Sequence, residues 1–129
     1  MISDERTEQI LLLAANEDYT GLYELIWALN GLFPDASLGE KYDAAERAAR
    51  KLLDLGWIRL YQADLRWERF EELDIASAKA TLSDPTSWYS VKWYPVKNWP
   101  SESEGVCIVF AATEAGERAY MSGAREDHN

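Results

Sequence analysis

A cysteine and a histidine are the side chains of this sequence that most readily act as nucleophile and base, and each occurs once. Cys107 stands inside the apolar run VCIVFAA, where a thiol usually serves as a small buried hydrophobe. His128 is next to the last residue, where the chain cannot readily hold it within hydrogen-bond distance of a nucleophile. The sequence therefore predicts no catalytic residue and no enzymatic activity.

Acidic residues that lie close together in the middle of the chain raise the question of a cation site. They are Glu68, Glu71, Glu72 and Asp74. A calcium loop needs carboxylates at fixed spacing around a required glycine, and this run has no such pattern. The sequence also lacks a glycine-rich phosphate loop and a paired cysteine and histidine pattern for zinc. We interpret the run as a solvated charged surface and expect no metal and no cofactor.

Aromatic residues between positions 62 and 105 indicate a different kind of chemistry, which is binding. Tryptophan and tyrosine anchor interfaces because each buries a large apolar area at low entropic cost. The candidate partner-binding residues are Trp67, Trp88, Trp93, Tyr94 and Trp99. Two alternatives stay open. The rings cover a smaller core of their own, or they stack on single-stranded bases, for which only Lys92 and Lys97 supply positive charge nearby.

One stretch, residues 37–61, organises the elements that must position these side chains. Ser37 and Glu40 have the spacing of a capping box, which gives a helix a defined start. Apolar residues then recur every three or four positions, and this predicts an amphipathic helix over residues 38–55 with one buried face. Gly56 ends the helix, and the apolar and aromatic residues that follow it predict a strand.

The other elements follow from the same kinds of pattern. They are a helix over residues 4–15, a second helix capped by Thr20 and ended by Asn30-Gly31, a strand over residues 106–112, and a helix from Thr113 to about Met121. The insertion of about residues 62–105 is too long for a structureless loop. Within it, residues 65–70 can extend the first strand, and Asp74 can cap a short helix that ends before Pro85.

Length and composition set the class of protein. The 129 residues, of which 47% are hydrophobic, suit a single domain at residues 1–122 and a flexible tail at residues 123–129. One cysteine makes no internal disulfide, and no apolar run approaches the roughly 20 residues that span a bilayer. The N-terminal residues lack the pattern of a secretory signal, so we expect a cytoplasmic protein with no membrane partner. The net charge of −10 repels nucleic acid at long range.

Two short motifs resemble a known superfamily. The first is Leu52-Leu53-Asp54-Leu55-Gly56-Trp57-Ile58, a helix that ends in leucines and passes through a glycine into a strand. The second is the later strand that runs into Thr113-Glu114-Ala115-Gly116. With three preceding helices, this order resembles the winged helix-turn-helix superfamily. The resemblance implies an α+β fold with a three-helix core, a wing hairpin that carries a helical insertion, and a C-terminal helix.

The resemblance also implies a way to bind DNA. In this superfamily the third helix usually enters the major groove, and the wing touches the DNA backbone or the minor groove. Carried over to residues 38–55 and to the wing, the candidate DNA-binding residues are Lys41, Tyr42, Arg47, Arg50, Lys51, Arg66 and Arg69. Here the wing is enlarged and net acidic. Within residues 43–54 the acids Asp43, Glu46 and Asp54 balance the bases Arg47, Arg50 and Lys51.

Three functions follow from this pattern. We expect a non-enzymatic, cytoplasmic winged-helix interaction module that binds a protein partner or associates with its own copy. The first alternative is a transcriptional regulator that binds double-stranded DNA through its third helix. The second is an acidic antidote-type protein that masks a basic partner, which the net charge of −10 favours. No small-molecule site is identifiable from the sequence.

Overall fold

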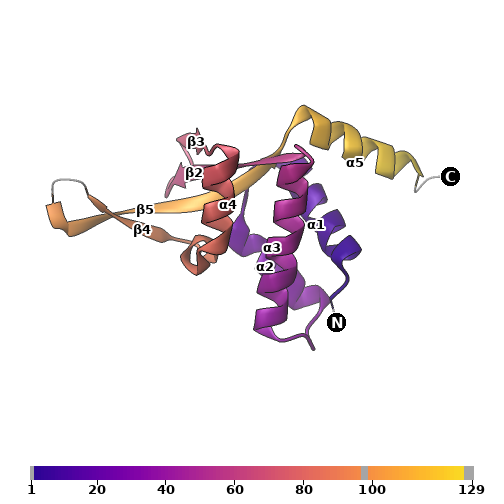
Figure 1. The fold of residues 1–129 in the computed structure, drawn as a ribbon, viewed down its shortest axis with the longest axis horizontal. Coiled ribbons are helices and arrows are strands. Elements are labelled where there is room, and N and C mark those ends of the chain that lie inside the picture. The colour runs from indigo at the N-terminus through magenta and orange to yellow at the C-terminus, as the bar shows by residue number, and fades with distance from the viewer. Residues whose placement is uncertain (1, 97–98, 127–129) are drawn as a thin grey trace.

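The computed structural model describes residues 2–96 and 99–126, and it describes side chains within residues 2–93 and 104–123. This part of the chain is an α+β fold with five α-helices and an antiparallel sheet of five strands (Figure 1). The elements are α1 (Asp4–Glu17), β1 (Thr20–Gly21), α2 (Leu22–Leu32), α3 (Leu38–Asp54), β2 (Ile58–Asp64), β3 (Phe70–Glu72), α4 (Ile75–Ser83), the 3₁₀ turn η1 (Pro85–Trp88), β4 (Lys92–Val96), β5 (Trp99–Ala112) and α5 (Glu114–Glu126).

Helix α3 forms as its pattern predicts. Ser37 caps it, and the Ser37 hydroxyl accepts a hydrogen bond of 3.1 Å from the backbone N–H of Glu40. Its alanines are buried, as are Leu52 and Leu53, because they lie on the face that packs against the other helices and the sheet. After the helix, Gly56 adopts a positive φ of 74°, a conformation that costs glycine little because it has no Cβ. The chain then enters β2 at Ile58.

The sheet is built around the long strand β5. Strands β1 and β2 flank β5 on its two sides, and β3 pairs with the outer edge of β2. Strand β2 pairs with β5 from Ile58↔Ala112 to Asp64↔Val106. Strand β4 pairs with the earlier part of β5, so the β4–β5 hairpin extends away from the helices (Figure 1).

The two faces of the sheet bury different clusters of side chains. Ile58 and Leu60 of β2, with Ile108 and Phe110 of β5, face the main core formed by the helices. The alternate positions Ala63, Cys107 and Val109 face a smaller cluster on the other side, because side chains alternate along a strand. Partly buried aromatic rings pack against that smaller cluster, namely Tyr19, Tyr23, Tyr61, Trp67 and Phe70.

The joint between β5 and α5 explains the Thr-x-x-Gly motif. The Thr113 hydroxyl donates a hydrogen bond of 2.5 Å to the carbonyl of Gly56 and accepts one of 3.1 Å from the N–H of Gly116. The Thr113 N–H donates to the carbonyl of Trp57 at 3.0 Å. A Cβ at Gly116 would lie 2.0 Å from the same Trp57 oxygen, so only glycine allows this approach.

In the insertion, the predicted extension of the first strand is not observed, whereas the predicted short helix is. Strand β2 stops at Asp64 rather than continuing to Phe70, because the Asp64 carboxylate accepts hydrogen bonds from the N–H groups of Glu68 and Arg69 and closes a turn. Asp74 caps α4 as predicted. Helix α4 packs into the main core through its buried residues, rather than covering a separate core of the insertion.

Several boundaries also differ from the predictions. Gly21, not Thr20, caps α2, and Thr20 pairs with Phe110 in the two-residue strand β1, which is too short to leave a sequence pattern. Strand β5 begins at Trp99, well before residue 106. Helix α5 continues to Glu126, into the predicted tail, because alanine, arginine and glutamate are strong helix formers. Among the described residues, no helix is long and apolar enough to cross a membrane.

Candidate functional site

The cations on one side of α3 are paired with acids of α1. Arg47 contacts the carboxylate of Asp4 at 3.1 Å, and Lys51 contacts that of Glu8 at 2.7 Å. The hydrogen bond to Glu8 raises the pKa of Lys51, so this lysine stays fully protonated at neutral pH. Both pairs lie at the surface, where they can exchange with other partners at low cost, but in the folded chain each base faces an acid.

The other side of α3 is covered by the helix of the insertion. Arg50 donates a hydrogen bond of 3.1 Å to the backbone carbonyl of Lys79 and another to the hydroxyl of Ser83. Asp54 pairs with the ammonium of Lys79 at 2.6 Å. Helix α4 therefore occupies the flank of α3 that presents Arg50, and this arginine is turned toward α4.

The remaining candidate DNA-binding residues lie in different surroundings. Lys41 is buried, and Tyr42 packs its ring edge-on against Trp88. Arg66 and Arg69 are exposed in the turn between β2 and β3. The exposed positions of α3 are Leu38, Gly39, Glu40, Asp43, Arg47, Lys51 and Asp54. This outward face carries three acids against two bases, and both of those bases are paired with α1.

The candidate partner-binding tryptophans whose side chains are described, Trp67, Trp88 and Trp93, do not form one patch. Trp67 packs on Phe70 in the smaller cluster, with its backbone at a positive φ of 56°. Trp88 is buried in the main core, whereas Trp93 on β4 is exposed. The side chains of Tyr94 and Trp99 lie outside the described residues, although their backbone belongs to β4 and β5.

A groove that we call the aromatic groove runs along α2, α3 and η1. It consists of two adjoining hollows of about 420 and 280 Å³ that share Tyr42, Trp88 and Tyr89. The larger hollow is also lined by Leu38, Asp43, Glu46, Leu82, Ser83 and Pro85. The smaller one is also lined by Tyr23, Ile26, Trp27 and Ser90.

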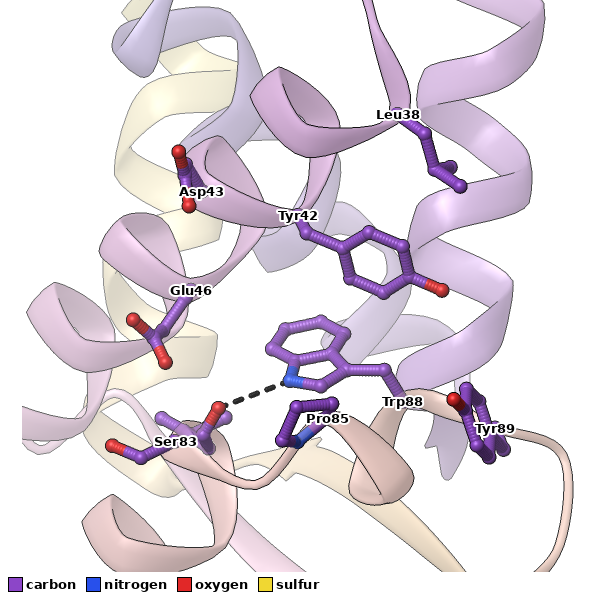
Figure 2. Close-up of a pocket in the computed structure, with 9 residues that line it drawn as sticks. Leu38, Tyr42, Asp43, Glu46, Ser83, Pro85, Trp88 and Tyr89 are labelled. Carbon is purple, nitrogen blue, oxygen red and sulfur yellow. Dashed lines mark hydrogen bonds between the residues drawn. The ribbon is translucent and has the colours of Figure 1, made fainter.

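Trp88 forms the floor of the groove. Its indole Nε1–H donates a hydrogen bond of 3.0 Å to the carbonyl of Leu82, which fixes the ring. The ring of Tyr42 lies above it with centroids 6.2 Å apart and planes at 90°, and Pro85 lies on the other side (Figure 2). Leu38 and Tyr89 flank this pair on one side, and Asp43 and Glu46 flank it on the other (Figure 2). The groove therefore has an apolar edge and an acidic edge.

Three large apolar side chains on the groove are exposed by more than half. Leu38 is 57% exposed, Trp27 is 64% exposed and Tyr89 is 54% exposed. Trp27 lies in α2, Leu38 is the first residue of α3, and Tyr89 follows η1. None of the three is among the partner-binding residues that were predicted from the sequence. Trp27 could have been found, because it follows Ile26 but lies outside the buried stripe of α2.

A polar cluster of the buried Ser87 and Lys92 with the partly exposed Asp84 holds η1 against β4 beside the groove. The ammonium of Lys92 donates a hydrogen bond of 2.9 Å to the hydroxyl of Ser87 and contacts the carboxylate of Asp84 at 3.0 Å. The hydrogen bond from Lys92 and those from Thr86 lower the pKa of Asp84 to about 2. The cluster fixes the segment that carries Trp88.

No family model matches this chain, and no curated protein and no solved structure matches it either. Among the residues that the structure describes, no group of three or more histidine, cysteine, aspartate or glutamate side chains could hold a metal ion. The aromatic groove combines apolar area, aromatic rings and two carboxylates, and this combination can bind a ligand.

Proposed function

We propose that this chain is a non-enzymatic winged-helix interaction module that binds another protein, or a second copy of itself, through the aromatic groove. One observation carries the proposal: Trp27, Leu38 and Tyr89 are each more than half exposed around one continuous groove. Large apolar side chains that gather at one place on a surface mark interaction sites, because leaving them in water costs free energy that a partner recovers.

The winged-helix part of the proposal has support in the order of the elements. Helix α3 passes through Gly56 into β2, and β5 returns beside β2 and leads into α5. The contacts of Thr113 and Gly116 with residues 56 and 57 tie this return to the end of α3. The motifs that carry the resemblance therefore meet at one joint of the fold.

The charge around α3 favours a protein over DNA as the partner. A duplex-binding helix presents cations that can replace the counterions of several phosphates. On α3 the exposed bases Arg47 and Lys51 already contact acids of α1, and Arg50 is turned toward α4. Binding of DNA would require these contacts to break and the acids to face phosphate, which repels them.

The test compares capture of proteins from a cell extract by immobilised wild-type and variant chains. We expect a partner that the wild type retains and that the double variant Trp27→Ser, Tyr89→Ser loses. Trp93→Ser is the matched control, because Trp93 is 62% exposed on β4 and lies outside the groove. Sedimentation equilibrium of the purified chain separates self-association from binding of a different protein.

Three results would count against the proposal. The groove variant could capture the same proteins as the wild type, which would remove the groove as the binding surface. Loss of capture by the Trp93→Ser variant alone would indicate that the partner binds the β4–β5 hairpin instead. Salt-sensitive binding of duplex DNA at about 50 mM salt, abolished by Arg47→Glu with Arg50→Glu, would establish the DNA-binding alternative instead.

A further inference from the structure

We propose that the partner docks a basic segment in the larger hollow of the aromatic groove, with a lysine or arginine side chain beside an apolar one. This inference rests on the proposed function and names the chemistry of the ligand at the same site. The hollow has a volume of about 420 Å³, which is enough for one long side chain and part of its neighbour.

The acidic edge of the hollow retains its capacity to accept hydrogen bonds. Asp43 makes no ion pair or hydrogen bond within the described part of the chain. Glu46 lies 3.8 Å from Arg50, but the hydrogen bonds of Arg50 run to Lys79 and Ser83 instead. A carboxylate accepts up to about four hydrogen bonds, so both acids can receive donors from a ligand.

The shape of the hollow matches the two parts of a basic side chain. The methylene stem of a lysine or arginine packs on apolar surface while its charged end reaches a polar rim. Here the floor of Tyr42 and Trp88 supplies the surface, and Asp43 and Glu46 supply the rim (Figure 2). The face of an aromatic ring also attracts a cation directly, and both Tyr42 and Trp88 line the hollow.

The apolar edge provides for the neighbouring residue of the ligand. Leu38 and Tyr89 lie across the Tyr42–Trp88 pair from the acids and are both more than half exposed (Figure 2). A segment that places an apolar side chain on this edge and a cation on the other would cover both. Alternating or adjacent basic and apolar residues meet this requirement.

The charge of the chain points to the same occupant. No lysine or arginine lines either hollow among the described residues, and the net charge is −10. A field of this sign attracts a basic segment and repels an acidic one before contact. It also opposes the docking of a second copy, which carries the same net charge.

The experiment selects binders from a library of random linear peptides displayed on phage, with the wild-type chain as the target. We expect the selected peptides to carry lysine or arginine next to leucine or an aromatic residue. A selected peptide is then synthesised and titrated into the ¹⁵N-labelled protein at about 0.15 M ionic strength. Shifts in the resonances of Tyr42, Glu46 and Tyr89 are expected.

A matched pair of double variants isolates the carboxylates. Asp43→Asn with Glu46→Gln removes two charges at helix positions three apart, and we expect it to weaken the peptide about fivefold or more. Glu114→Gln with Glu117→Gln makes the same change of charge at the same spacing on the exposed start of α5, and we expect less than a twofold effect. Equal weakening by both pairs would overturn the inference, because the attraction would then depend on net charge alone.

The other outcomes separate this inference from the proposed function. If uncharged or acidic peptides shift the groove resonances, the inference that the ligand is basic would be overturned. The groove would remain a proposed protein-binding site. Selected peptides that bind elsewhere, or a selection that yields no binder, would count against the groove itself and so against both proposals.

Discussion

Substitution of Gly116 by alanine should destabilise the fold, although it replaces glycine in a helix. A Cβ at this position would lie 2.0 Å from the backbone oxygen of Trp57, far inside van der Waals contact. A backbone atom cannot rotate away as a flexible side chain does, so α5 must move. That movement weakens the hydrogen bonds from Thr113 to the carbonyls of Gly56 and Trp57.

The magnitude follows from three contributions. Loss of two hydrogen bonds costs about 2 kcal/mol, and overpacking costs about 1–3 kcal/mol. Alanine in a helix interior gains up to about 1 kcal/mol over glycine. The free energy of unfolding should therefore fall by about 2–4 kcal/mol, and Tm should fall by roughly 10 °C for a domain of this size.

The assay is urea unfolding followed by tryptophan fluorescence, with thermal unfolding by circular dichroism as a second measure. Gly123→Ala is the matched control in the same helix, because a Cβ there has no neighbouring atom within 4 Å. It should leave stability unchanged or raise it by up to about 1 kcal/mol. A Gly116→Ala variant as stable as the wild type would refute the close approach of α5 to Trp57.

Three further predictions concern single interactions of the fold. Acidification should remove the stabilisation that the pair of Asp84 and Lys92 provides. In the folded chain the pKa of Asp84 is lowered to about 2. The stabilisation is therefore complete above about pH 4 and is lost as pH falls toward 2. Asp84→Asn should flatten that part of the pH profile in urea unfolding, and an unchanged profile would contradict the pair. Burial raises the pKa of the Cys107 thiol to about 11, so the native chain should react with a thiol reagent at pH 8 only as fast as it unfolds, and rapid labelling would contradict this burial. Trp88→Phe should lower the free energy of unfolding by about 1–3 kcal/mol because it removes the hydrogen bond to Leu82 and leaves a gap in the core, whereas an unaltered midpoint would show that the indole is not held.

Much of the fold could be predicted from local patterns. The cap at Ser37, the amphipathic spacing of α3, the stop at Gly56 and the cap of α4 at Asp74 are local signals, and the structure confirms each of them. Strand β1 could not be predicted, because its two residues are a strand only through pairing with β5. Such pairing is a property of the tertiary structure and leaves no period in the sequence.

The site was less accessible to sequence reasoning. Glu46 and Arg50 stand four residues apart on α3, a spacing that allows a pair within the helix, but no local pattern indicates that α4 binds Arg50 from outside the helix. Trp88 looked like a candidate contact residue, and burial makes it the floor of a groove instead. Residues from three distant segments form that groove, so its edges emerge only when the insertion folds onto α3.

We expect partners to bind in the aromatic groove and not on the outward face of α3. Chemical-shift mapping of the ¹⁵N-labelled chain tests it directly, with the captured partner in one titration and duplex DNA at about 50 mM salt in another. We expect shifts at the indole N–H of Trp27 and at Tyr42 and Tyr89 with the partner, and none with DNA. Shifts centred on Arg47 and Lys51 with DNA, and an unaffected groove with the partner, would contradict it.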